Sequence, residues 1–335
     1  MPLLNRAQLL SLLGLTVLIA SCCAIWMGAA ALPLTAWFCD NSSCQGDSYI
    51  LWQIRLPRVC AALLIGASLA ISGAAMQGMF RNPLVDSGII GVSSGADLAA
   101  ALYIVLLAHY IPTNALPYAL PIAAFLGSWG VTFALYRLSH RHGQLHIAIM
   151  LLIGIALAAL TGAVTGLLIY VANDNQLRDI TFWSMGSLAS INWKMVVILS
   201  IVLIGTVPIM LRNARALNAL SLGEASALHM GFTIQTVKKR LIICVALQTG
   251  SCVAFAGSIG FIGLVVPHLI RLLGGSDHRS LLPASLLGGA ALLTLADTLS
   301  RTLISPAELP IGILTSLFGV PFLGLLVWKS GTRYD

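Results

Sequence analysis

Residues able to carry out chemistry are few in this sequence, and their spacing matches no common catalytic motif. The 335 residues include 11 acidic side chains, 7 histidines and 7 cysteines. The sequence contains no GxxxxGK[ST] loop to cradle phosphates and no HExxH pair to bind zinc. We therefore expect a protein that is not an enzyme and holds no cofactor or metal. Any ATP on which it depends would be hydrolysed by another subunit.

His268 is the histidine whose surroundings most invite a metal or haem ligand. It lies in the apolar segment VVPHLIR, directly after Pro267 and three residues before Arg271. A histidine that begins a helix and bonds backbone groups also fits this context, and we favour that interpretation.

The cysteines show no metal-site spacing such as CxxC. Simple packing is the expected role of the five that fall in apolar stretches, namely Cys22, Cys23, Cys60, Cys244 and Cys252. Cys39 and Cys44 instead flank a polar segment between the first two apolar stretches. Since a loop outside the cytoplasm permits oxidation, we predict a disulfide between them, with two free thiols as the alternative.

The elements that must position these residues are membrane-spanning helices. The chain is 58% hydrophobic and 9% charged, whereas soluble domains carry about 25% charged residues. A bilayer core about 30 Å thick needs roughly 20 apolar residues per helix. We predict an all-α polytopic membrane protein with about ten transmembrane helices in one domain, residues 1–335. The spans lie near residues 8–31, 58–80, 88–108, 117–137, 147–172, 194–212, 236–257, 259–271, 281–301 and 309–329.

Few ionisable residues fall within these spans. Secondary transporters place ionisable groups at mid-membrane to couple ions, at a cost of about 2.5 to 3.5 kcal/mol each. Here Asp97 and Asp297 are expected near span ends, so we predict an external energy source. A secondary transporter or channel that works alone stays open as the alternative class of protein.

Basic residues indicate the orientation, because lysine and arginine accumulate on the cytoplasmic side of a membrane. With the amino terminus inside, 13 of the 18 basic residues fall on inner loops and ends. The remaining five are Arg55, Arg58, Arg178, Lys194 and Arg301. We predict that both termini are cytoplasmic, and we attribute the net charge of +7 to this topology and not to nucleic-acid binding.

Seven segments, in order along nearly the whole chain, resemble one family. They are WQIRLPR (52–58), GASLAISGAAMQGMFRNPL (66–84), GVSSGAD (91–97), GEASALHMG (223–231), GSIGFIGLVVPHLIR (257–271), DHRSLLP (277–283) and LADTLSR with AELPIG (295–312). They are similar to the FecCD-like permeases of bacterial ABC importers for iron chelates, haem and cobalamin. The resemblance implies the type II importer fold in the bacterial inner membrane. The implied partners are a second copy of the chain, two cytoplasmic ATP-binding subunits, a periplasmic substrate-binding protein and the lipid bilayer.

The resemblance also implies a coupling segment and a gate. Residues 217–231 look like the helices that dock on each ATPase; the alternative is an amphipathic helix resting on the membrane surface. The coupling residues would be Gly223, Glu224, Ala225, Leu228 and Gly231, with both glycines at turns. The cytoplasmic gate would be Asn82, Leu84, His146, Ile147 and Ala148. His146 departs from the family pattern, and the alternative interpretation of this residue is a histidine in a solvated loop.

Arg55, Arg58 and Arg301 match family arginines that receive acidic residues of the binding protein. We expect an exposed cluster on the outer side, with snorkelling anchors at helix ends as the alternative. The segment NDNQLRDITFWSMGSLAS at 173–190 looks most like the haem permeases. Haem import is therefore the predicted function, with siderophore or cobalamin import as the alternative cargo.

Overall fold

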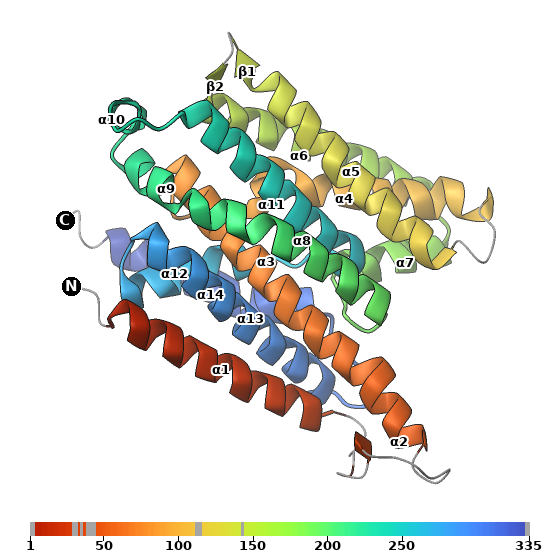
Figure 1. Cartoon of the computed structure of the whole chain (residues 1–335). Helices are drawn as coiled ribbons and strands as arrows, with labels where there is room; N and C mark the ends of the chain where they lie inside the picture. The colour runs from red at the N-terminus through yellow and green to blue at the C-terminus, as the bar shows by residue number, and fades with distance from the viewer. Residues whose placement is uncertain are drawn as a thin grey trace.

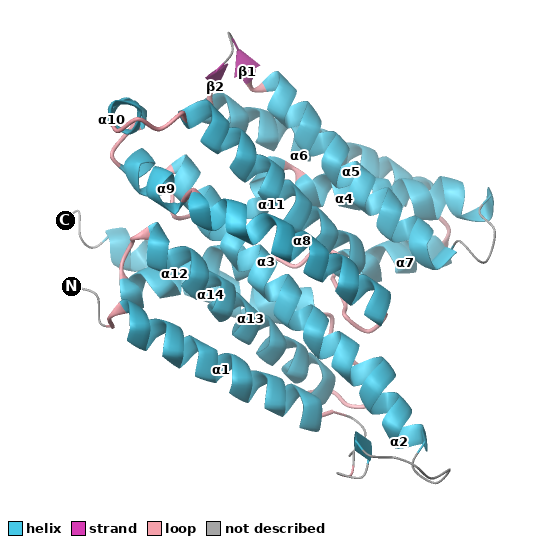
Figure 2. Cartoon of the chain, in the orientation of Figure 1, coloured by secondary structure: helices cyan, strands magenta, loops and turns pink. Residues whose placement is uncertain are grey.

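The computed structural model of the chain describes residues 4–28, 33, 36–37, 45–110, 116–141 and 144–331. Helix accounts for most of these residues, and the strands that they contain form one small antiparallel hairpin (Figure 2). The predicted disulfide partners Cys39 and Cys44 lie outside the described residues.

The long helices are α1 (Arg6–Trp26), α3 (Leu56–Phe80), α5 (Leu116–Leu138), α6 (Ile147–Val171), α8 (Trp193–Arg212), α11 (Ile234–Ala256), α13 (His278–Thr302) and α14 (Ile311–Gly331). The shorter ones are α2 (Gln45–Tyr49), α4 (Val92–Leu102), α7 (Asp174–Ser184), α9 (Ala214–Ser221), α10 (Glu224–His229) and α12 (Ile262–Gly274). The π and 3-10 turns are η3 (Ile50–Arg55), η4 (Ser87–Ile90), η5 (Tyr103–Leu107) and η6 (Ala108–Tyr110). The hairpin strands are β1 (His140–Arg141) and β2 (Gln144–Leu145).

These helices confirm the predicted spans. Within the described residues, eight helical stretches are long and apolar enough to cross a membrane, and two shorter apolar helices, α12 and the start of α14, match the eighth and tenth predicted spans. At 13 residues α12 is too short to cross alone, as its sequence indicated. The third span begins at Val92 and not near residue 88, because η4 precedes it.

The helices run side by side in one elongated bundle (Figure 1). One end, which we call the α10 end, holds the start of α1, the end of α14, α9, α10 and the β1–β2 hairpin. The opposite end, which we call the α7 end, holds α2, α7 and the end of α1.

Helix α3 is the centre of the bundle and packs against α13, α12, α11 and α8. Small residues allow this close approach. A Cβ added at Gly66 would overlap the Gly289 carbonyl of α13, and one at Gly73 would overlap the Gly263 carbonyl of α12. In lipid, packing of this kind and not the expulsion of water drives helix association.

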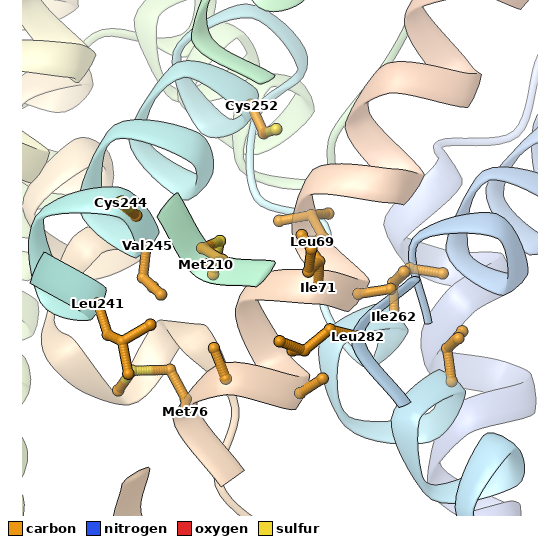
Figure 3. Packing of buried hydrophobic residues seen from close by; sticks show 14 of the residues in the cluster. Leu69, Ile71, Met76, Met210, Leu241, Cys244, Val245, Cys252, Ile262 and Leu282 are labelled. Carbon is orange, nitrogen blue, oxygen red and sulfur yellow. The ribbon is translucent and has the colours of Figure 1, made fainter. Parts of the chain in front are cut away.

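The packed core contains both apolar and polar contacts. Figure 3 shows side chains of α3, α8, α11, α12 and α13 gathered in one cluster, with Leu69 and Ile71 of α3 among them. A buried hydrogen-bond chain crosses the same helices. Ser72 donates to Gln248 Oε1 at 2.7 Å, and Gln248 Nε2 donates to Thr206 Oγ1 at 2.7 Å. These bonds fix α3, α11 and α8 in register, since no water competes for the polar atoms.

Candidate functional site

Residues 217–231 form two helices, α9 and α10, joined at a glycine turn. Gly223 has φ +111° and ψ 155°, and Gly231 has φ +85°. Both glycines lie at turns, as predicted, and in conformations that L-residues rarely adopt. Space does not impose glycine here, since a Cβ would meet nothing within 4 Å at either position. The backbone conformation alone imposes it.

Helix α9 is attached to the start of α13. Asn218 Nδ2 donates to Asp277 Oδ1 at 2.6 Å, and its Oδ1 accepts from the His278 backbone N at 2.9 Å. Burial favours the neutral carboxyl of Asp277, but the bonds from the Arg279 N–H and from Asn218 outweigh it and lower the pKa of Asp277. The Asp277 carboxylate therefore both caps α13 and attaches α9 to it.

Helix α10 is attached to α11 by an ion pair. Glu224 Oε1 lies 2.7 Å from Lys238 Nζ, and the Lys238 side chain is 1% exposed. In the sequence, Lys238 is one of three consecutive basic residues, and we assigned all three to an inner loop. Nothing in that run distinguishes it from Lys239 and Arg240, which are exposed.

The predicted gate residues lie in the turn after α3 and at the start of α6. Asn82 follows α3, and its Oδ1 accepts from the Leu84 N–H at 2.9 Å. Leu84 is 46% exposed. His146 occupies the N-cap position of α6 without a side-chain capping hydrogen bond, and Ile147 and Ala148 are the first residues of that helix. The structure thus places the two segments at helix ends, and their role as a gate stays a prediction.

Asp86 lies just after the first of these turns and caps η4 through the Ser87 N–H at 2.7 Å. Burial raises the pKa of Asp86, and the hydrogen bonds from Ser87 oppose that shift.

Two residues compensate for a missing backbone hydrogen bond in α12, and the sequence alone did not single them out. They are Gln77 and Arg271. Pro267 has no N–H, so the Gly263 carbonyl lacks its helical donor; Gln77 Nε2 donates to that carbonyl at 3.2 Å. Arg271 Nη2 in turn donates to Gln77 Oε1 and orients the amide. His268 lies inside α12, so its interpretation as a helix-start residue is wrong. Its ring packs edge-on against Phe322 instead, with ring centres 6.1 Å apart.

The three outer arginines meet at the α7 end. Arg58 Nε and Nη2 bond Asp297 at 2.9 Å each, and Arg58 Nη1 bonds Glu308 at 2.8 Å. Arg301 Nε lies 3.3 Å from the second oxygen of Asp297. We expected exposed arginines, but the structure buries all three, with Arg55, Arg58 and Arg301 only 4%, 5% and 6% exposed. Their role in docking is not decided by this burial and stays a prediction.

Two of these arginines also cap α1. Its last carbonyls have no helical donor. Arg301 Nη2 donates to Ala24 O at 2.9 Å, and Arg55 Nη1 donates to Ile25 O at 2.7 Å. Positive charge at a helix carboxyl end also complements the helix dipole. The cluster therefore joins α1, α3 and α13 at the α7 end.

Asp97 is the second acidic residue expected near a span end. The structure places it inside α4, where it accepts a bond from Ser258 Oγ at 2.9 Å. Among the described residues, no group of three His, Cys, Asp or Glu is arranged to hold a metal.

Comparison with known proteins identifies relatives along nearly the whole chain. The profile of the FecCD transport family matches residues 15–329. The hemin transport system permease protein HmuU of Yersinia pestis is 46% identical over 306 residues, covering 91% of this chain and 90% of that protein. The vitamin B12 import system permease protein BtuC of Klebsiella pneumoniae is 39% identical over 323 residues, covering 96% and 93%. A solved inward-facing transporter assigned to the metal-chelate ABC type superposes with a TM-score of 0.82 at 35% identity, covering 97% of this chain and all of that one.

The arginine cluster makes a stability prediction. Asp297 is 1% exposed and serves two arginines, whereas the Glu308 side chain is 41% exposed. Removing one partner of a buried ion pair costs about 3–5 kcal/mol, and an exposed pair contributes about 0–1 kcal/mol. We expect Asp297→Asn to lower the free energy of unfolding in detergent by about 3–5 kcal/mol. Glu308→Gln should lower it by about 0–1 kcal/mol. Equal losses in the two variants would contradict this assignment.

Proposed function

This chain belongs to the FecCD transport family and is the permease subunit of an ABC importer, and we propose that its cargo is an iron chelate, haem in particular. The observation that carries the cargo is the 46% identity to a hemin permease, against 39% to a vitamin B12 permease of similar coverage. Cobalamin is the second candidate, because that relative matches a slightly larger share of the chain.

The assembly that we propose has two copies of this chain in the bacterial inner membrane, two ATP-binding subunits at the α10 end and a binding protein at the α7 end. The distribution of basic residues supports a cytoplasmic α10 end and cytoplasmic termini. A surface hollow of about 660 Å³ between α7, the loop that joins α11 to α12, and α14 is lined by Ser184, Ser258 and Ser316 among apolar residues. Hydroxyl groups suit a surface that faces a water-filled path between two copies better than one that faces lipid.

The α9–α10 segment is the site that we propose for ATPase docking. Large apolar side chains protrude from it, with Leu222 66%, Leu228 59% and Met230 55% exposed. Exposed apolar groups clustered at one end of a membrane protein support a contact with another protein. Glu224, Ala225 and the two glycine turns shape this surface, so they belong to the same proposed site.

Transport assays test the cargo. We expect liposomes that contain the permease, its ATPase and its binding protein to accumulate haem when ATP is added. They should accumulate neither cobalamin nor a ferric siderophore. ATP-dependent accumulation of cobalamin alone would reassign the cargo. Haem accumulation by the permease without the ATPase would instead support a secondary transporter.

Substitution of Gly223 tests the coupling site. Valine fits the open space around Gly223 but not its backbone conformation, so Gly223→Val should distort the α9–α10 turn. We expect normal membrane insertion and at least a tenfold loss of haem uptake per ATP hydrolysed. Gly205→Val is the matched control, because Gly205 has equal space inside α8 without a positive φ. Wild-type uptake in Gly223→Val would count against a coupling role.

The docking proposal concerns Arg55, Arg58 and Arg301, with acidic residues of the binding protein as partners. Their burial means that such residues would approach past the half-exposed Glu308 carboxylate. We expect association to slow as salt rises. Glu308→Gln should speed association with the binding protein a few-fold, because it removes a repelling charge. Slower association in surface plasmon resonance would show that Glu308 itself is the contact and would refute docking through the arginines.

A further inference from the structure

Both backbone polar groups of Leu145 are held by side chains of α11. The Leu145 N–H donates to Gln235 Oε1 at 2.9 Å, and Lys238 Nζ donates to the Leu145 carbonyl at 3.1 Å. Leu145 is 3% exposed and ends β2, and the next residues are His146, Ile147 and Ala148. The strand that leads into the predicted gate is therefore attached to α11 through one residue.

Lys238 makes a second bond, to Glu224 at the start of α10. The Nζ to Oε1 distance is 2.7 Å, and the lysine side chain is 1% exposed while that of the glutamate is 40% exposed. A buried ammonium group is stable only while its partners remain in place. Because one Nζ serves both groups, α10 cannot separate from α11 without either moving the ammonium or leaving it without its carboxylate.

We propose that Lys238 is a positioning residue that transmits movement of the α9–α10 segment to β2 and the gate segment after it. This inference rests on the proposed function, since it assumes that an ATPase moves α10. One ammonium group joins Glu224 on the docking surface to the Leu145 carbonyl. Displacement of α10 pulls on Lys238, and Lys238 pulls on the strand that sets the position of residues 146–148.

The experiment uses the complete complex of permease, ATPase and binding protein in liposomes, with haem as the transported probe. Lys238→Met removes the ammonium and keeps a flexible stem of similar length. Lys239→Met is the matched control, because Lys239 is the adjacent residue on α11 and is exposed. We expect haem moved per ATP hydrolysed to fall at least tenfold in Lys238→Met and to stay within twofold of wild type in Lys239→Met.

A second measurement separates transmission from simple stabilisation. In wild type and in Lys239→Met, hydrogen exchange of residues 144–150 should change on addition of nucleotide, whereas in Lys238→Met this nucleotide-dependent change should be lost. A purely structural lysine would raise exchange equally with and without nucleotide, and that result would overturn the proposal. Equal haem per ATP in Lys238→Met and Lys239→Met would also overturn it.

Glu224→Gln tests the same link from its half-exposed side and does not depend on the assembly of Lys238→Met. It removes the charge and keeps the shape, so we expect a smaller, about threefold, loss of haem per ATP. Combined with Lys238→Met it should add no further loss, because both changes break one connection. Additive losses would show independent roles and refute the relay. Failure of the wild-type permease to bind any ATPase would instead refute the proposed function.

Discussion

Every backbone carbonyl freed inside this bundle needs a donor from elsewhere in the chain, because the hydrocarbon core of a bilayer supplies none. Pro267, near the middle of α12, frees the Gly263 carbonyl in the first turn of that helix, and the Gln77 amide of α3 takes the place of the missing N–H. The last turn of α1 frees further carbonyls, and Arg55 and Arg301 donate to them. Gln77, Arg55 and Arg301 thus replace missing backbone donors, and each one joins two helical elements as it does so.

These connections divide the bundle into a tightly packed part and a looser part. Helix α3 meets α12 and α13 through glycines with carbonyl oxygens against them, so that part has little freedom to change its spacing. In helix α6, by contrast, only 17% of the residues in the most apolar segment are buried within the subunit. In the stretch that contains α3, 83% of the residues in the corresponding segment are buried. The helices around α3 are therefore the part of the bundle least able to change its spacing, and α6 packs outside them, against α4 and α5.

Apolar length was sufficient to predict the spans, because a membrane helix is defined by its own residues. The short α12 was also predictable from its apolar length, and the glycine turns at 223 and 231 were predictable from the resemblance of residues 217–231 to the coupling helices of the family. The partners of the charged residues were not. Arg58 and Asp297 are 239 positions apart, so local sequence gives no sign that they pair, and a count of basic residues by side of the membrane treats a buried arginine as an exposed one. Lys238 was missed for the same reason, because its role depends on Glu224 and Leu145 and not on its neighbours.

The two attachments of the α9–α10 segment lead to different parts of the bundle. Asn218 joins α9 to the start of α13, in the tightly packed part, by hydrogen bonds that involve Asp277 and His278. Glu224 joins α10, through one lysine, to α11 and to β2, the strand that leads into α6. The Gly223 turn lies between the two attachments, and a Cβ there would meet no neighbouring atom. We infer that a load applied to this segment turns α10 relative to α9 about Gly223, because α9 is held to the rigid part. Under the proposed relay that displacement passes through Lys238 to β2 and leaves the glycine contacts of α3 with α12 and α13 unchanged.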